Sequence, residues 1–251
     1  MRTRVPRSRW ALVADARSGH RRKRHEIPPP VAELPSPGLG PLDEAAAKGL
    51  LEAVGIRTPQ RRVCASRDEA RAAWAELGGR AVVKVLDPAV THKSEVGGVH
   101  VGVDSSETLE AALDAINRLS TDGRVRYLVE ELADPGVELI LGGMRDPSFG
   151  PTVVLGVGGI AAEAIGDVAL RLAPLSVGDA EEMIEELSGK KLLEGFRGQP
   201  TIDRAELVDA ILAVSRLLVA LPDIFELDIN PMRATASGLV ALDALVLTAA
   251  E

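Results

Sequence analysis

The sequence predicts an α+β fold, and three observations support this prediction. Segments with a helical spacing of apolar residues alternate with short β-branched runs. Several of these runs follow one another across a turn, which is typical of antiparallel hairpins rather than of a continuous β-α-β winding. The chain has 251 residues, 46% hydrophobic but only 2% aromatic, so its core is expected to consist mainly of Ala, Val, Leu and Ile.

Charge and cysteine content exclude several classes of protein. Residues 1–26 contain nine Arg and Lys against Asp15 and Glu26, a net +7, so the total of −8 leaves −15 for the remainder. A body this acidic and poor in aromatic residues disfavours nucleic acid as a partner. The single cysteine, Cys64, excludes an internal disulfide and suits a cytoplasmic protein. We expect neither a membrane span nor a secretory signal, because no apolar run is long enough.

Residues 1–40 are expected to form a basic, proline-rich tail or linker. A charge run at residues 21–24 is followed by six prolines from Pro28 to Pro41, which prevent a regular helix. A disordered tail is favoured over an arm that binds nucleic acid. Ordered structure is therefore predicted to begin at Leu42-Asp43.

Helices and strands are then predicted in order from apolar spacing and from their caps. Asp43 caps the first helix and Gly55 ends it, and a capping-box pattern from Ser66 to Glu69 begins the second. The expected helices cover residues 43–54, 66–77, 104–119, 179–187 and 207–221. The expected strands begin at 81 and 99 and cover 127–129, 137–141, 152–155, 168–172, 224–229 and 239–247, with turns at 146–147 and 149–151.

Residues 81–101 gather polar groups near a strand that looks buried. Lys84 lies within an apolar run, and a polar loop containing His92 leads to Gly97-Gly98. An ionisable group on a buried strand is costly unless it is paired or used, so this stretch predicts a phosphate-handling site. The structural alternatives are a lysine that extends to solvent from a strand end and an ordinary solvated loop histidine.

A glycine-rich segment follows one of the predicted strands. Residues 156–161 formally match the dinucleotide fingerprint, but Gly166 and a β-like run come soon afterwards, so the required β-α-β unit is missing. A glycine loop that approaches an anion or a histidine loop is favoured, with a purely structural turn as the alternative. The P-loop pattern does not occur in the sequence.

Acidic and amide side chains near the end of the chain suggest a metal site. Asp228 and Asn230 lie on the same face of a predicted strand, and a hairpin through Gly238 brings Asp243 opposite them. Carboxylate and amide oxygens suit Mg²⁺, which keeps several other ligands. The alternative is that Asp228 and Asn230 end the strand in a turn before Pro231.

Taken together, these motifs resemble the ATP-grasp β subunit, or β-like domain, of ADP-forming acyl-CoA synthetases. Acetate–CoA ligase (ADP-forming) is one member and succinyl-CoA synthetase is a relative. The resemblance covers residue 41 to the C-terminus. It rests on Val83-Lys84, residues 87–99 (DPAVTHKSEVGGV), Glu138, 143–151 (GMRDPSFGP), Gly158-Gly159-Ile160, Glu163, 171–174 (RLAP), 228–231 (DINP) and Asp243-Ala244.

The resemblance implies an ATP-grasp fold in which two α/β subdomains, residues 41–129 and 130–251, hold the nucleotide between them. It implies an acid–thiol ligase that converts acyl-CoA, ADP and phosphate into free acid, CoA and ATP through phosphohistidine. The cofactors implied are ATP or ADP and Mg²⁺. The chain would need a CoA-binding α subunit or fused α domain, through which CoA and a small carboxylic acid enter.

The resemblance also implies roles for individual residues. His92 would relay the phosphoryl group, Asp228 would orient a phosphohistidine, and Glu163 and Arg171 would complete the catalytic set. The remaining assignments are Lys84, Val129, Glu130, Glu131, Leu132 and Glu138 for the nucleotide, Gly158 and Gly159 for the phosphate loop, and Asn230 and Asp243 for the metal.

Two rival functions remain open. One is an ATP-grasp carboxylate ligase that works without phosphohistidine, which the motif around His92 disfavours. The other is a regulatory or inactive ATP-grasp module. The joint presence of Lys84, His92, Asn230 and Asp243 disfavours loss of activity.

Overall fold

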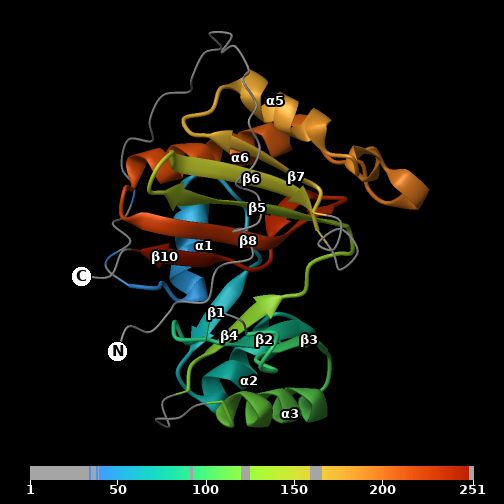
Figure 1. Cartoon of the computed structure of the whole chain (residues 1–251). Helices are drawn as coiled ribbons and strands as arrows, with labels where there is room; N and C mark the ends of the chain where they lie inside the picture. Colours follow the sequence, from blue (N-terminus) through green and yellow to red (C-terminus); the bar gives the residue numbers. More distant parts are fainter. Residues whose placement is uncertain are drawn as a thin grey trace.

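Two lobes, each built on an antiparallel sheet, make up the computed structural model (Figure 1). The structure describes residues 34, 38, 40–90, 93–119, 125–158 and 166–248. The predicted α+β class is confirmed, since helices and hairpin-like strands alternate along the chain. Among the residues described, no helix is both long and apolar enough to cross a membrane.

The helices and strands begin and end as follows. The helices are α1 Glu44–Ala53, α2 Arg67–Glu76, α3 Ser106–Asn117, α5 Val177–Glu186, α6 Arg204–Ala220 and the short 3-10 helices η2 Lys190–Leu193 and η3 Phe196–Gly198. The strands are β1 Arg61–Cys64, β2 Ala81–Val85, β3 Val99–Val103, β4 Tyr127–Glu131, β5 Val137–Asp146, β6 Gly150–Val157, β7 Val168–Leu172, β8 Ile224–Thr235, β9 Gly238–Ala241 and β10 Leu245–Thr248.

The smaller lobe is a four-stranded sheet in the order β1-β4-β2-β3, with α2 and α3 packed on one face (Figure 1). Ser66 accepts a hydrogen bond from Glu69 N at the start of α2, and a capping box at Ser105 begins α3. Val83 and Val129 point into the core beneath the helices. Because side chains alternate along a strand, Lys84 and Glu130 point from the opposite face.

The larger lobe is a six-stranded sheet in the order β10-β8-β5-β6-β7, with β9 paired to one end of β8. Helices α1, α5 and α6 form one core with alternate residues of the strands, including Leu139, Leu141 and Ile229. The antiparallel pairing of β6 with β7 rules out the Rossmann interpretation of residues 156–161, which requires a parallel crossover.

Helix α1 lies in the larger lobe, whereas a division of the chain at residue 129 would assign it to the smaller one. Its apolar residues Ala47, Leu50 and Leu51 pack in the core of the larger lobe, so α1 belongs to that lobe although it precedes the smaller one in sequence. The predicted cap is confirmed, since Asp43 Oδ1 accepts a hydrogen bond from Ala46 N at 2.9 Å. An amphipathic stripe predicts burial but does not identify the sheet that covers it.

Three strand predictions were incomplete. Strand β1 was missed because two of its four residues, Arg61 and Arg62, are charged. Gly150 and Pro151 belong to β6 rather than to a turn. The single strand expected at 239–247 is two strands, β9 and β10, which pair with different parts of β8.

Candidate functional site

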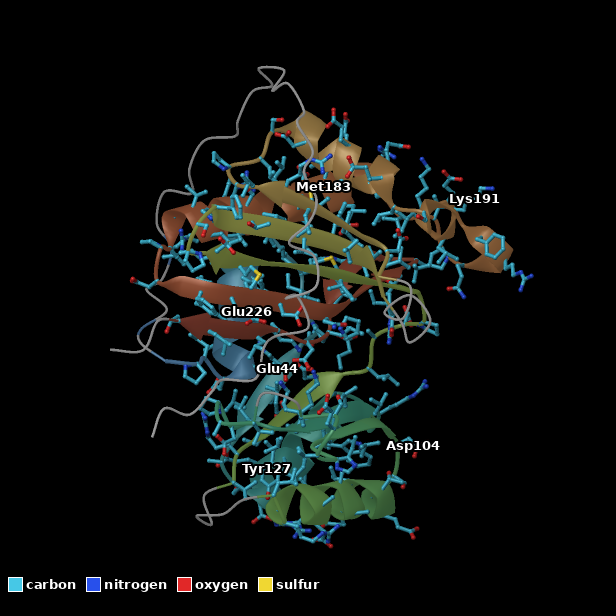
Figure 2. All side chains as sticks on the ribbon, viewed as in Figure 1. Glu44, Asp104, Tyr127, Met183, Lys191 and Glu226 are labelled. Atoms are coloured by element: carbon cyan, nitrogen blue, oxygen red, sulfur yellow. The ribbon has the colours of Figure 1, made fainter. Side chains whose placement is uncertain are left out.

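Six charged residues meet between the two lobes and form what we call the charge cluster. Its members are Glu44 and Lys48 of α1, Lys84 of β2, Glu130 of β4, Lys93 of the β2–β3 connection and Asp243 of the β9–β10 connection. Figure 2 shows Glu44 at the level where the two lobes meet. The cluster therefore joins residues from both lobes and contains three lysines and three carboxylates.

Lys84 is held by protein acceptors from three directions. Its ammonium lies 2.5 Å from Glu44 Oε1 and 2.8 Å from Glu130 Oε2, and it donates to the Leu242 carbonyl at 2.6 Å. Of the three N–H donors of the ammonium, two are used in hydrogen bonds to Glu44 and to Leu242, and Glu130 is held as an ion pair. Lys84 thus links β2 of the smaller lobe to the main chain of the larger one.

Lys48 repeats this arrangement and is fully buried. Its ammonium lies 2.9 Å from Glu44 Oε1 and 2.5 Å from Glu130 Oε1, and it also donates to Leu242 O at 2.9 Å. Both lysines therefore share the same two carboxylates and the same carbonyl. Buried charges are tolerated when they are paired in this way.

Lys93 completes the cluster with longer contacts. Its ammonium lies 3.1 Å from Glu44 Oε2 and 3.2 Å from Asp243 Oδ1. The Asp243 side chain is 29% exposed, whereas those of Glu44 and Glu130 are 1% and 2% exposed. Asp243 is therefore the carboxylate through which the cluster reaches solvent.

The cluster shifts the pKa values of its members in different directions. Burial alone would raise the pKa of Glu44, but the three lysines hold it well below its ordinary value. Burial would lower the pKa of Lys84, but Glu44 and Glu130 raise it. Burial and the charge of Lys84 lower the pKa of Lys48, and burial together with Glu44 raises that of Asp243. Glu44 therefore stays ionised among the lysines.

The proposed metal ligands lie where the strands become irregular. Leu227 and Ile229 are buried, while Asp228 and Asn230 point to the other face of the sheet, as their alternation predicts. Two residues of β8, Asn230 and Pro231, fall opposite one residue of β5, which is a β-bulge. Proline cannot donate to the ladder, which explains the bulge at this point.

The β9–β10 break brings Asp243 close to this bulge, since Leu242 N donates to Pro231 O at 2.9 Å. Asp243 offers a partly exposed carboxylate and Asn230 a partly exposed amide. Within the described ranges, no group of three or more His, Cys, Asp or Glu residues could hold a metal ion. Mg²⁺ is bound by one or two carboxylates together with water and phosphate oxygens, so this donor set fits it.

Glu138 and Gly158 lie in close contact at the end of β6. Gly158 N donates to Glu138 O at 2.7 Å, and a Cβ on Gly158 would lie 2.9 Å from the Glu138 carbonyl carbon. No side chain fits there, so a glycine is required. The Glu138 carboxylate pairs with Arg233 at 2.6 Å across the β5–β8 ladder.

The expected hinge residues 129–132 serve different purposes. Val129 is buried in the core of the smaller lobe, and Glu130 is bound in the charge cluster. Glu131 and Leu132 line a cleft of about 430 Å³. Its other walls come from residues 57–59 and from the β8–β9 region, so the cleft lies between the lobes beside the hinge.

Arg171 is not brought to this site. Its guanidinium pairs with Glu186 and Glu182 of α5. It lies opposite Val153, which points into the helix-covered core, whereas Asp228 points to the other face of the sheet. Three further predicted residues, His92, Gly159 and Glu163, lie outside the described residues.

Sequence reasoning missed Glu44, Lys48 and Lys93. Positions 44, 47, 48 and 51 lie on one face of α1, so two charged residues occupy its buried stripe. Opposite charges four residues apart on an apolar face were the available signal for Glu44 and Lys48. Lys93 gave no such signal, because a lysine in a polar loop is usually solvated.

Comparisons with known proteins agree on one family. A family model described as an ATP-grasp domain matches residues 36–247. An ADP-forming acetate–CoA ligase I of Archaeoglobus fulgidus is 36% identical over 205 residues, which are 78% of this chain and 30% of that protein. The β subunit of ADP-forming acetate–CoA ligase I from Pyrococcus furiosus is 35% identical over 209 residues, 81% of this chain and 90% of the subunit.

Solved structures of one enzyme resemble this chain over most of its length. These are of the dinucleotide forming acetyl-coenzyme A synthetase 1 of Ca. Korarchaeum cryptofilum. Its complex with coenzyme A, Ca-AMPCP and HgCl+ has a TM-score of 0.78 and 39% identity, covering 84% of this chain and 94% of that one. Its complex with coenzyme A and Mg-AMPPCP, whose phosphohistidine segment points towards the nucleotide binding site, has a TM-score of 0.68 and 40% identity, covering 82% and 92%.

Proposed function

This chain belongs to the ATP-grasp domain family, and on that premise we propose that it is the nucleotide-binding β-type part of an ADP-forming acyl-CoA synthetase. The homologues compared above are ADP-forming CoA ligases. The observation that carries the proposal is the charge cluster, which places three lysines beside Asp243 at the junction of two lobes. Nucleotide phosphates and Mg²⁺ need this combination of cations and one accessible carboxylate.

The proposed step on this chain is a phosphoryl transfer between His92 and ADP. The P–N bond of phosphohistidine breaks as a P–O bond forms to the terminal phosphate of ADP, and the imidazole takes up a proton. Mg²⁺, when bound, would neutralise phosphate charge. Such transfers depend mainly on positioning and on electrostatic stabilisation. Neutral imidazole is also a competent nucleophile near pH 7 for the reverse step.

Individual residues of this chain would have the following roles. Lys84 would supply fixed positive charge near the phosphates, and Asn230 and Asp243 would hold Mg²⁺. Asp228, on the same face of the sheet as Asn230, would orient the phosphohistidine. The main chain of residues 129–132 would meet the adenine, Glu138 would approach the nucleotide, and Gly158 and Gly159 would approach phosphate. Glu163 remains a proposed member of the catalytic set, while Arg171 is left out because of its place on the opposite face.

The complete reaction would require a CoA-binding α part, either a separate subunit or a fused domain. The matched region is 30% of the Archaeoglobus fulgidus ligase but 90% of the Pyrococcus furiosus β subunit, which supports both arrangements among relatives. CoA and a small carboxylic acid would enter through that part. A cytoplasmic location stays a prediction.

The test is phosphorylation of the whole chain with Mg²⁺ and γ-labelled ATP. We expect acid-labile, base-stable label that His92→Ala removes and that the control His25→Ala retains. Label that survives in His92→Ala would contradict the relay. If no label forms even with a cognate CoA-binding partner, the regulatory module is favoured instead. Acyl phosphate formation without labelled histidine would favour a carboxylate ligase.

A further inference from the structure

We propose that Lys93 exchanges partners within the charge cluster. It leaves Asp243 when a divalent cation binds that carboxylate, and its ammonium then binds a phosphate oxygen of the nucleotide. This inference rests on the proposed function, because it takes Asp243 as a ligand of the metal that accompanies the nucleotide. It adds a phosphate-binding residue that the sequence motifs did not assign.

The contacts of the three lysines differ in a way that singles out Lys93. Lys84 and Lys48 each donate two hydrogen bonds, one to a carboxylate and one to the Leu242 carbonyl, and each ammonium lies within 2.9 Å of a second carboxylate. Lys93 pairs with only two carboxylates of the cluster, at 3.1 and 3.2 Å. These use at most two of its donors. A phosphate would have to displace shorter protein contacts at Lys84 than at Lys93.

The contacts that Lys93 makes are also the longest in the cluster. Glu44 Oε2 is buried and makes no hydrogen bond among the residues that the structure describes, so its contact with Lys93 is a charge contact only. Asp243 is the exposed carboxylate of the cluster, at 29%. Mg²⁺ keeps several of its waters, so it can approach Asp243 but not the enclosed carboxylates of Glu44 and Glu130.

Charge balance makes the exchange favourable. Three lysines offset three carboxylates in the cluster, so a divalent cation at Asp243 adds positive charge beside the Lys93 ammonium and repels it. Nucleotide phosphates supply the negative charge that Lys93 then needs. A charge-assisted hydrogen bond to phosphate is stronger than a pair held at 3.2 Å beside a competing cation.

The exchange requires only the side chain of Lys93 to move. Its carbonyl accepts a hydrogen bond from Gly98 N at 2.7 Å. A Cβ on Gly98 would lie 2.6 Å from Val85, so the glycine allows this close turn against β2. The main chain of Lys93 is thus held at this turn, and its four-carbon side chain is long enough to reach a new partner. Because Lys93 follows His92 directly in the sequence, the ammonium would act next to the proposed phosphoryl carrier.

Two binding measurements on the whole chain test the exchange. Mn²⁺ affinity is measured without nucleotide by electron paramagnetic resonance, and Mg·ADP affinity by calorimetry. In Lys93→Met we expect Mn²⁺ to bind at least fivefold tighter, because its competitor is gone. Mg·ADP should bind about 10- to 100-fold more weakly, which corresponds to one hydrogen bond involving a charged group. Lys93→Arg should recover part of the nucleotide affinity.

The control is Lys191→Ala, an exposed lysine of η2 far from the cluster in Figure 2, which should change neither affinity. In Lys93→Met the two affinities are expected to change in opposite directions. Loss of folding would instead weaken the binding of both ligands. An affinity within twofold of the original for either ligand overturns the exchange. A wild-type chain that binds neither Mn²⁺ nor Mg·ADP overturns the proposed function as well.

A measurement on the unmodified chain covers the case in which Lys93→Met does not fold. Amine acetylation followed by mass spectrometry reports how accessible each lysine is. Lys93 is 6% exposed, so it should react slowly alone, faster with Mn²⁺, and slowly again when ADP is added. Lys191 should react equally in all three conditions. Lys93 reactivity that does not respond to Mn²⁺ contradicts the exchange.

Discussion

Lys48→Met is the substitution that most directly tests the charge cluster as a structural link between the lobes. Methionine has a similar length but no charge, so Glu44 and Glu130 would each lose a partner at 2.9 and 2.5 Å, and the Leu242 carbonyl would lose one donor. Removing one member of a buried pair costs about 3–5 kcal/mol. Lys84 still neutralises both carboxylates, and burying Lys48 is itself unfavourable, so we expect the lower end, about 3 kcal/mol.

Urea unfolding at pH 7 with two probes measures this loss. Circular dichroism follows the whole chain, while the fluorescence of Trp74, measured in a Trp10→Phe background, follows the smaller lobe, where Trp74 donates to Val103 O at 2.9 Å. A loss of about 3 kcal/mol corresponds to a fall in melting temperature of about 6–12 °C for a chain of this size. Because the cluster joins the lobes, the two transitions should also separate in Lys48→Met.

The control for Lys48→Met is Arg62→Met. Arg62 pairs with Glu76 at 3.3 Å on the surface, with both side chains more than half exposed, so its loss should cost less than about 1 kcal/mol. A Lys48→Met chain that unfolds within about 1 kcal/mol of the original, with coincident transitions, would refute the reasoning. The cluster would then contribute charge to the site without holding the lobes together.

Two further predictions concern pH and packing. The pKa of Glu44 lies below its ordinary 4.5, because the lysines of the cluster outweigh the effect of burial. The contribution of ionised Glu44 to stability is therefore present above pH 4.5 and is lost progressively as the pH falls below that value. In Glu44→Gln, the urea midpoint should therefore change less between pH 6 and pH 3 than in the original chain. Gly158→Ala should lower the melting temperature by the equivalent of about 1–3 kcal/mol, because its methyl group meets the Glu138 backbone. Gly49→Ala, in open space within α1, should raise the melting temperature by the equivalent of about 0.5–1 kcal/mol. Equal effects of the two alanine substitutions would contradict the packing argument.

Local patterns predicted most of the elements because their causes are local. The cap at Asp43, the capping pattern from Ser66 and the end of α6 before Pro222 depend on neighbours within a few residues. Strand β8 was predicted at its start but not beyond Pro231, since a proline normally ends a central strand. The bulge opposite β5 lets the strand continue, and a bulge depends on the partner strand.

Sequence alone also singled out Lys84, Asn230 and Asp243 as candidate functional residues, since each stands within an apolar run or a turn motif. It could not identify the partners of Lys84, because Glu44 lies 40 residues earlier and Leu242 lies 158 residues later. Only the tertiary structure packs α1 against the larger sheet and thereby carries Glu44 and Lys48 to the lysine of the smaller lobe. Periodicity fixes which face of an element is buried, whereas the neighbours of that face are decided by long-range packing.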